Sequence, residues 1–152
     1  MDHGMKAAEL FTQGYNCAQS VAAAFCDVTG LDEKTAARMA SPFGGGMGRM
    51  REVCGAVSGM YLVLGWLYGY DTPGDDVSKK ALYADVQAMG ARFREQAGSI
   101  VCREILRNPP SDPNPTPRTA EFYQKRPCAR MCLLAGRILD DYIAAHPLEK
   151  SK

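Results

Sequence analysis

The chain has 152 residues, of which 46% are hydrophobic and 23% charged, and its formal net charge is +1. This length fits one domain with a sizeable core, and the near-neutral charge gives no electrostatic basis for binding nucleic acid or an anionic membrane. The start, MDHGMKAAEL, has no basic region followed by an apolar run, and the most apolar stretch, residues 60–70, is too short to span a bilayer. We therefore expect a cytoplasmic protein without membrane insertion.

The first part of the chain predicts three helices separated by glycines, over residues 2–13, 17–28 and 33–40. Gly14 is suited to end the first of them. Asn16 followed by Gln19 is typical of a capping box at the start of the second helix. Asp32 is the expected cap of the third.

The rest of the chain predicts five further helices. Four of them cover residues 49–67, 100–106, 120–124 and 127–145, and the fifth runs from a capping residue within 75–78 to residue 96. Ser99 is the expected cap of the helix over 100–106. Five of the ten residues in 108–117 (NPPSDPNPTP) are proline, so this segment is predicted to be an extended loop inserted into the bundle. Apolar residues rarely alternate with period two. We predict an all-α, single-domain bundle of about six to eight helices over residues 1–152, with no significant β-sheet.

The stretch SPFGGGMGRMREVCGAVSG, residues 41–59, combines a glycine run with a cysteine. It lacks the Lys-Ser or Lys-Thr of a phosphate-binding P-loop, and no strand precedes it, as a dinucleotide fingerprint requires. A glycine turn at Gly45 and Gly46 could hold an anion or a cluster sulfide through backbone N–H groups. Gly55 and Gly59, four residues apart on a helix, suggest close approach by a neighbouring helix or by a bound cofactor.

Six cysteines are present, none of them in a Cys-x-x-Cys pair: Cys17, Cys26, Cys54, Cys102, Cys128 and Cys132. Cytoplasmic cysteines more often bind metal or carry out redox chemistry than form structural disulfides. Without Cys-x-x-Cys, neither a thioredoxin-type motif nor a zinc finger is indicated. A shared cysteine site would have to be assembled from distant segments by the fold.

Four of the cysteines are predicted to lie near the starts of helices: Cys17, Cys54, Cys102 and Cys128. Helix N-termini present unpaired N–H groups and a partial positive charge, which favour the thiolate and lower the cysteine pKa. Arg49 and Arg51 would add to this effect at Cys54. The alternative is that each is a small buried hydrophobic residue. Cys26 is interpreted as a core residue, and Cys132 as a core residue, a fifth ligand or a resolving thiol.

The segments GYNCAQSV, SPFGGGMGRMREVCGAVSG, VCREIL and RPCARMC together resemble a redox-active protein family named for the pattern C_GCAxxG_C_C. The resemblance covers about residues 7–141 and pairs the four family cysteines with Cys17, Cys54, Cys102 and Cys128. The family motif is written GCAxxG, whereas this chain reads CGAxxG from Cys54 to Gly59. The resemblance implies a redox or cofactor role, and a similarity to part of the split-Soret cytochromes favours an iron–sulfur site. Covalent c-type haem is excluded because no C-x-x-C-H is present.

Three hypotheses follow for function. In the first, Cys17, Cys54, Cys102 and Cys128 ligate an iron–sulfur cluster, or a zinc ion in its place, for electron transfer with an unidentified partner. In the second, the protein is a metal-free thiol–disulfide oxidoreductase or redox sensor, in which Cys54 or Cys17 is the nucleophile. In the third, the chain is a structural or interaction module with core cysteines. A homodimer is compatible with the apolar and aromatic content, and the sequence does not decide whether the protein is an enzyme.

Overall fold

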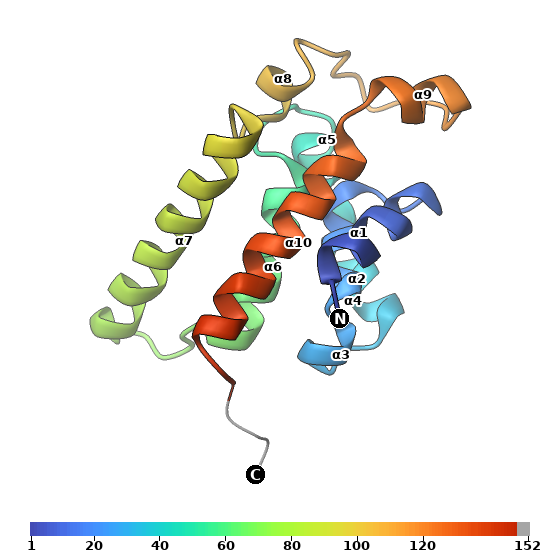
Figure 1. Ribbon diagram of the computed structural model, residues 1–152. Helices are drawn as coiled ribbons and strands as arrows, with labels where there is room; N and C mark the ends of the chain where they lie inside the picture. Colours follow the sequence, from blue (N-terminus) through green and yellow to red (C-terminus); the bar gives the residue numbers. More distant parts are fainter. Residues whose placement is uncertain (149–152) are drawn as a thin grey trace.

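The computed structural model describes residues 1–148, and every regular element in them is helical (Figure 1). The elements are α1 (His3–Thr12), α2 (Cys17–Ala24), α3 (Cys26–Thr29), α4 (Glu33–Ala40), a 3₁₀ turn η1 (Ser41–Phe43), α5 (Gly44–Met47), α6 (Gly55–Tyr68), α7 (Asp76–Ala97), α8 (Cys102–Ile105), α9 (Ala120–Lys125) and α10 (Cys128–Ala145).

Within residues 1–148, seven helices have six or more residues, and α3, α5 and α8 are four-residue segments. The predicted all-α fold of about six to eight helices is therefore confirmed. Extended pairing in this part of the chain is limited to one antiparallel bridge, between Val53 and Val101. None of the helices there combines the length and apolar character that crossing a bilayer requires.

Side-chain caps begin several helices as the sequence predicted. The Asn16 side chain accepts a hydrogen bond from the Gln19 backbone, and the Gln19 side chain accepts one from the Asn16 backbone. This reciprocal capping box places the next residue, Cys17, at the first helical position of α2. Asp32 caps α4 through the Thr35 backbone, and Asp75 caps α7 in the same manner.

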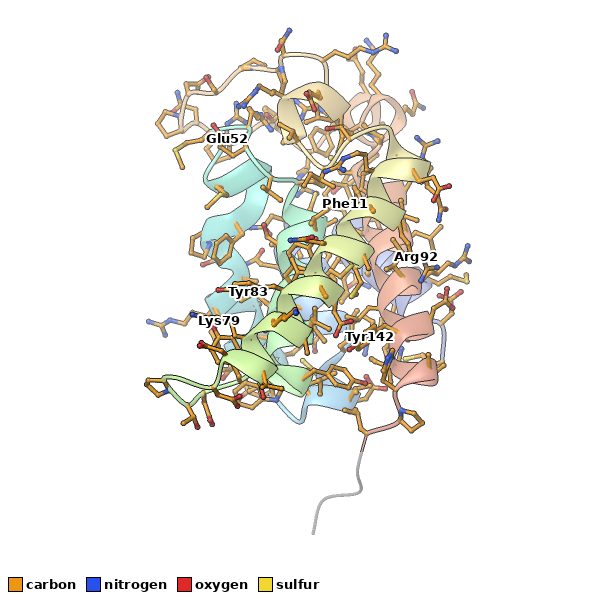
Figure 2. The ribbon with its side chains drawn as sticks, turned by 90° about the vertical axis from the view of Figure 1, so that its left-hand side faces the viewer. Phe11, Glu52, Lys79, Tyr83, Arg92 and Tyr142 are labelled. Atoms are coloured by element: carbon orange, nitrogen blue, oxygen red, sulfur yellow. The ribbon has the colours of Figure 1, made fainter. Side chains whose placement is uncertain are left out.

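The core lies where α10 packs along α1 and where α2 packs against α1, α4 and α6. Its largest fully buried side chains include Phe11, Phe25, Met60, Leu64, Phe93, Ile138 and Leu139. Each such side chain contributes about 1.5–3 kcal/mol to folding by leaving water. The long helix α7 covers α6 and α10 from outside (Figure 2), and polar contacts join it to α10: Arg92 to Asp141 at 2.9 Å and Tyr142 to Asp85 at 2.7 Å.

Two predicted helices begin later in the structure than expected. The predicted start of α6 at Arg49 is wrong, because Arg49 and Arg51 have φ values of 66° and 61° and the helix begins at Gly55. The helix predicted from residue 100 with a Ser99 cap begins at Cys102 instead. Both differences have the same cause: residues on either side of Val53 and Val101 are extended and pair with each other.

His3 anchors the first helix to two distant segments. This residue is 7% exposed, and its ring stacks on Phe25, with ring centroids 4.3 Å apart. Its Nδ1 lies 2.6 Å from Asp140 on α10, and its Nε2 lies 3.0 Å from Asp27 on α3. These contacts fasten the N-terminal helix against the bundle and thereby support α2, which follows it.

Gly59 lets α6 approach α2 closely. A Cβ at this position would stand 2.7 Å from the Ala18 carbonyl oxygen and 3.0 Å from Val21 Cβ. Gly65 lies on the same helix, but a Cβ there would meet nothing within 4 Å. The two glycines therefore offer a matched pair for measuring how tightly the helices pack.

We predict that Gly59→Ala lowers the free energy of unfolding by about 1–3 kcal/mol, because the added methyl group collides with the α2 backbone. Gly65→Ala should be neutral or raise it by up to about 1 kcal/mol, since alanine favours the helix and space is free. Urea unfolding followed by circular dichroism measures both. Equal stability of the two variants would contradict the close packing at Gly59.

Candidate functional site

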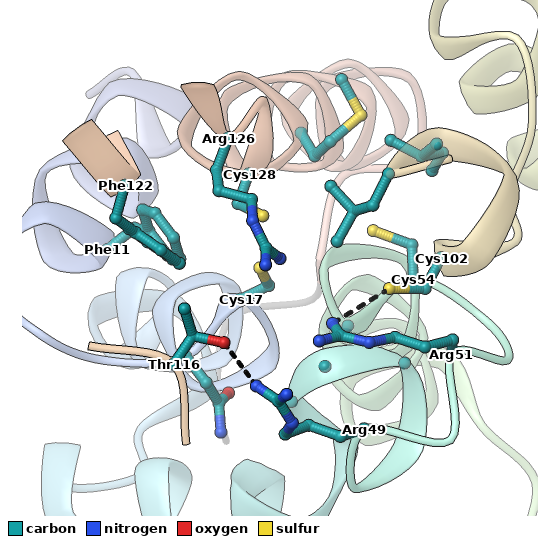
Figure 3. Close-up of a pocket in the computed structure, with 18 of the residues that line it drawn as sticks. Phe11, Cys17, Arg49, Arg51, Cys54, Cys102, Thr116, Phe122, Arg126 and Cys128 are labelled. Atoms are coloured by element: carbon teal, nitrogen blue, oxygen red, sulfur yellow. Dashed lines mark hydrogen bonds between the residues drawn. The ribbon is translucent and has the colours of Figure 1, made fainter. Parts of the chain in front are cut away.

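A cavity of about 250 Å³ is lined by residues from several segments (Figure 3). It lies at the end of the bundle where Figure 1 places α5, α8, α9 and the start of α10. Its lining contains four cysteines and four arginines, and no aspartate or glutamate: Cys17, Cys54, Cys102, Cys128, Arg49, Arg51, Arg118 and Arg126. The structure thus brings together the four cysteines that the sequence singled out. Cys26 and Cys132 do not line the cavity.

Cys17 and Cys128 form one side of the cysteine cluster. Each is the first residue of its helix, α2 for Cys17 and α10 for Cys128, and the two helices pack together. Their thiols lie near each other at the wall of the cavity (Figure 3), and each influences the pKa of the other. Cys132 is fully buried one turn further along α10, with its sulfur 3.8 Å from the Cys17 carbonyl oxygen. The three cysteines therefore form a contiguous sulfur-rich corner of the core.

Cys54 and Cys102 are joined through backbone pairing. The Cys54 N–H donates to the Ile100 carbonyl at 2.7 Å, and the Cys102 N–H donates to the Glu52 carbonyl at 2.6 Å. These bonds flank the bridge between Val53 and Val101. Cys54 is the N-cap residue of α6 and Cys102 the first residue of α8. The pairing thus places two helix starts, 48 residues apart in the chain, beside each other.

The glycine turn before Cys54 packs directly against the cysteines. Gly45 and Gly46 have φ values of 68° and 71°, which glycine adopts without steric cost. A Cβ at Gly46 would lie 2.6 Å from Cys102 Cβ, and one at Gly55 would lie 3.1 Å from Cys17 Cβ. Gly45, Gly46 and Gly55 line the cavity, whereas Gly59 faces α2 and does not. Of the four glycines expected at a cofactor site, Gly59 therefore serves helix packing.

Arg49 and Arg51 hold the proline-rich segment over the cavity. Arg49 Nε donates to the Asp112 carbonyl at 2.7 Å and its Nη1 donates to the Thr116 hydroxyl, while Arg51 Nε donates to the Pro110 carbonyl at 2.9 Å. Left-handed backbone at a non-glycine residue costs about 1–2 kcal/mol. Both arginines adopt it, and their hydrogen bonds to the loop help to offset that cost. The loop forms one wall of the cavity through Pro115 and Thr116.

The Arg51 side chain is almost completely buried, with 4% of its surface exposed. Its Nη1 lies 3.7 Å from the sulfur of Cys102 (Figure 3). Its Nη2 is buried and has no hydrogen-bond partner within residues 1–148. A buried guanidinium donor without an acceptor is costly, so this atom points to a negatively charged or hydrogen-bond-accepting occupant of the cavity.

The expectation that helix starts lower the thiol pKa values is wrong for this arrangement. Burial raises the pKa of Cys54 to about 12, although the Ala56 and Val57 N–H groups act against it. Burial also raises the pKa of Cys102, opposed by the hydrogen bond and charge of Arg51. Desolvation and neighbouring sulfurs thus outweigh the helix ends, because a thiolate in an apolar site loses its hydration.

The pair Cys17 and Cys128 titrates under mutual influence. For Cys17 the largest influence is the hydrogen bond with Cys128, which lowers its pKa, but Cys132 and burial outweigh it and the pKa is raised well above its ordinary value. The hydrogen bond with Cys17, followed by burial, raises the pKa of Cys128. Two adjacent buried thiolates repel each other, so the pair retains its protons unless a positive charge is supplied.

The four sulfurs surround the cavity and do not meet at one point. Among residues 1–148, no group of three or more His, Cys, Asp or Glu side chains is placed to hold a metal ion. A cavity of about 250 Å³ is also larger than one ion requires. The arrangement therefore suits a multi-atom group in contact with several cysteines better than a single tetrahedral ion.

Several cavity residues were not singled out from the sequence. Arg118 lies over the Phe11 ring at 4.4 Å and donates to the carbonyl oxygens of Phe11 and Tyr15. Arg126 lies over the Phe122 ring at 5.3 Å, and Figure 3 shows it pointing toward Cys128 and Cys17. Only the position of Arg126 two residues before Cys128 was a usable signal, because the other contacts depend on the fold.

We predict that the reduced, metal-free protein loses stability above about pH 9. An unfolded cysteine ionises near 9.0, whereas folded Cys54 holds its proton to about 12. The stabilisation from this raised pKa is complete below pH 9 and is lost as the pH rises toward 12. Urea unfolding with reductant and chelator at pH 7–10.5 measures the slope, and Cys54→Ser should reduce it by up to about 1.4 kcal/mol per pH unit. Identical slopes would contradict the assignment.

Comparison with known proteins agrees with the cysteine arrangement. Neither a curated protein nor a solved structure shows a significant match to the chain. A family model does match, over residues 15–142, which include all four cavity cysteines and the glycine turn. The chain therefore belongs to the family described as "Putative redox-active protein (C_GCAxxG_C_C)".

Proposed function

We propose that the protein is an electron-transfer protein that holds an iron–sulfur cluster on Cys17, Cys54, Cys102 and Cys128. The observation that carries the proposal is the convergence of these cysteines, from four separate segments, on one cavity lined by arginines and no carboxylate. Iron–sulfur clusters are held by four cysteine thiolates and carry net negative charge, which positive neighbours stabilise. The reducing cytoplasm would keep these thiols available for ligation.

The cavity residues are suited to such a group in size and charge. The space exceeds that of a single ion, and the thiols lie around it in two pairs, Cys17 with Cys128 and Cys54 with Cys102. The raised pKa values of these thiols mean that binding must displace protons, which the positive charge of iron would accomplish. A zinc ion would require the sulfurs to move closer together.

When bound, an iron–sulfur cluster takes up and releases single electrons. The chain's own groups would set the energy of that change. Arg51 donates toward the Cys102 sulfur, and the Ala56 and Val57 N–H groups lie near the Cys54 sulfur. Donors near cluster sulfurs favour the more negative, reduced state and raise the potential. The proline-rich loop contributes Pro115 and Thr116 to the wall of the cavity.

Anaerobic reconstitution with iron and sulfide tests the proposal. We expect brown protein with visible absorption, and Cys54→Ser or Cys102→Ser should bind iron at least about tenfold more weakly and retain less of it, because loss of even an outer-shell partner costs 10- to 100-fold in affinity. Cys26→Ser is the matched control, since Cys26 lies outside the cavity. Iron and sulfide analysis provides the measurement. Colourless wild-type protein without iron, or equal loss in Cys26→Ser, would contradict the proposal.

The contact between Cys17 and Cys128 favours a second candidate, a metal-free dithiol. In this case the two thiols give up two electrons and two protons to a disulfide or peroxide oxidant and form one S–S bond. Cys132, beside Cys17, would be the nearest further thiol. The absence of Cys-x-x-Cys makes this pair unlike a thioredoxin site.

Mild oxidation of the metal-free protein distinguishes the candidates. If the dithiol is functional, mass spectrometry after alkylation should find a Cys17–Cys128 disulfide, while Cys26 remains alkylated. Cys17→Ser should abolish this product. If all six thiols persist under an oxidant that converts a model dithiol to its disulfide, this candidate is ruled out. If the protein also takes up no iron, only the structural role of the cysteines remains.

A further inference from the structure

We propose that the cavity also binds a small oxyanion, a carboxylate or phosphoryl group, between Arg51 and Arg126. The proposal gives the redox site a substrate class, which electron transfer alone does not require. Both guanidinium groups point into the cavity, from the glycine turn and from the segment before α10 respectively (Figure 3).

The hydrogen bonds of the arginines separate structural from available donors. Arg49 uses its donors on Pro110, Asp112 and Thr116 of the loop. The Arg118 guanidinium is similarly engaged, by the carbonyl oxygens of Phe11 and Tyr15 and the hydroxyl of Tyr123. These two arginines therefore hold the walls of the cavity together.

Arg51 and Arg126 retain unused donors. Arg51 contacts Pro110 through Nε and Cys102 through Nη1, but its buried Nη2 has no partner within the described residues. No hydrogen bond or ion pair to the Arg126 guanidinium occurs there either, and its contact is with the Phe122 ring. A guanidinium edge with free N–H groups is the fork that binds carboxylate and phosphate oxygens.

The charge of the cavity supports an anion over a neutral ligand. Its lining includes no aspartate or glutamate that could neutralise Arg51, although this side chain is 4% exposed. A buried charge without a counter-charge is strongly unfavourable, and a bound oxyanion would supply both the charge and the missing acceptor. The ligand would lie next to Cys102 and Cys128, within reach of the proposed redox group.

Titration of the reduced, cluster-free protein with inorganic phosphate and with acetate, at constant ionic strength, tests the site by calorimetry and NMR. Arg51→Gln and Arg126→Gln should each weaken binding at least about tenfold, because each removes charge-assisted hydrogen bonds. Arg92→Gln, which removes an arginine outside the cavity, should leave affinity within about twofold. The tighter of the two anions identifies the ligand group.

Absence of binding to the wild type, or affinities of Arg51→Gln and Arg126→Gln equal to that of the wild type, would overturn the proposal. If Arg51→Gln does not fold, Arg126→Gln and Arg51→Lys decide, since lysine keeps the charge but lacks the planar fork. The same titration on cluster-loaded protein should retain binding, and loss of binding on loading would overturn the proposal that the anion binds beside the redox group. Failure to take up iron would contradict the proposed function and leave the first titration unaffected.

Discussion

The cavity depends on one short backbone contact, the antiparallel bridge between Val53 and Val101. The hydrogen bonds beside it join Cys54 to Ile100 and Cys102 to Glu52, so that two helix starts face the same space. If residues 49–54 were helical, this edge would be lost and Cys54 would be separated from Cys102. The left-handed turn before the bridge, and the glycines that permit it, are therefore part of the site and not merely a connection.

Charge balance is the second constraint on this end of the bundle. Cys17, Cys54, Cys102 and Arg51 are buried and Cys128 is partly buried, and burial disfavours both thiolate and unpaired guanidinium. A neutral thiol cannot balance the charge of the guanidinium. The charge is balanced only when a thiol loses its proton or when an anionic group occupies the cavity. This explains why the pKa values are raised at helix starts that would lower them in water-exposed surroundings.

The two walls of the cavity are held in place by different kinds of contact. The cysteines Cys17 and Cys128 begin the paired helices α2 and α10, whose contacts with α1 and α6 form the core. The wall on the other side is the proline-rich loop, held mainly by the hydrogen bonds of Arg49 and Arg51. One wall is therefore part of the helical core, whereas the other is a surface loop attached by polar contacts.

The sequence by itself determined the all-α class and most helix limits, because capping residues, glycines and helical periodicity are local signals, and it singled out Cys17, Cys54, Cys102 and Cys128 as candidates; that these four line one cavity was decided by the fold. The capping box at Asn16 and Gln19 shows this directly, since it places Cys17 at a helix start. The tertiary structure alone decided that residues 52–54 are extended, that Gly59 packs on α2, and that Arg126 enters the cavity. It also decided the direction of the thiol pKa shifts, because burial and contacts between sulfurs distant in the chain arise only when the helices pack.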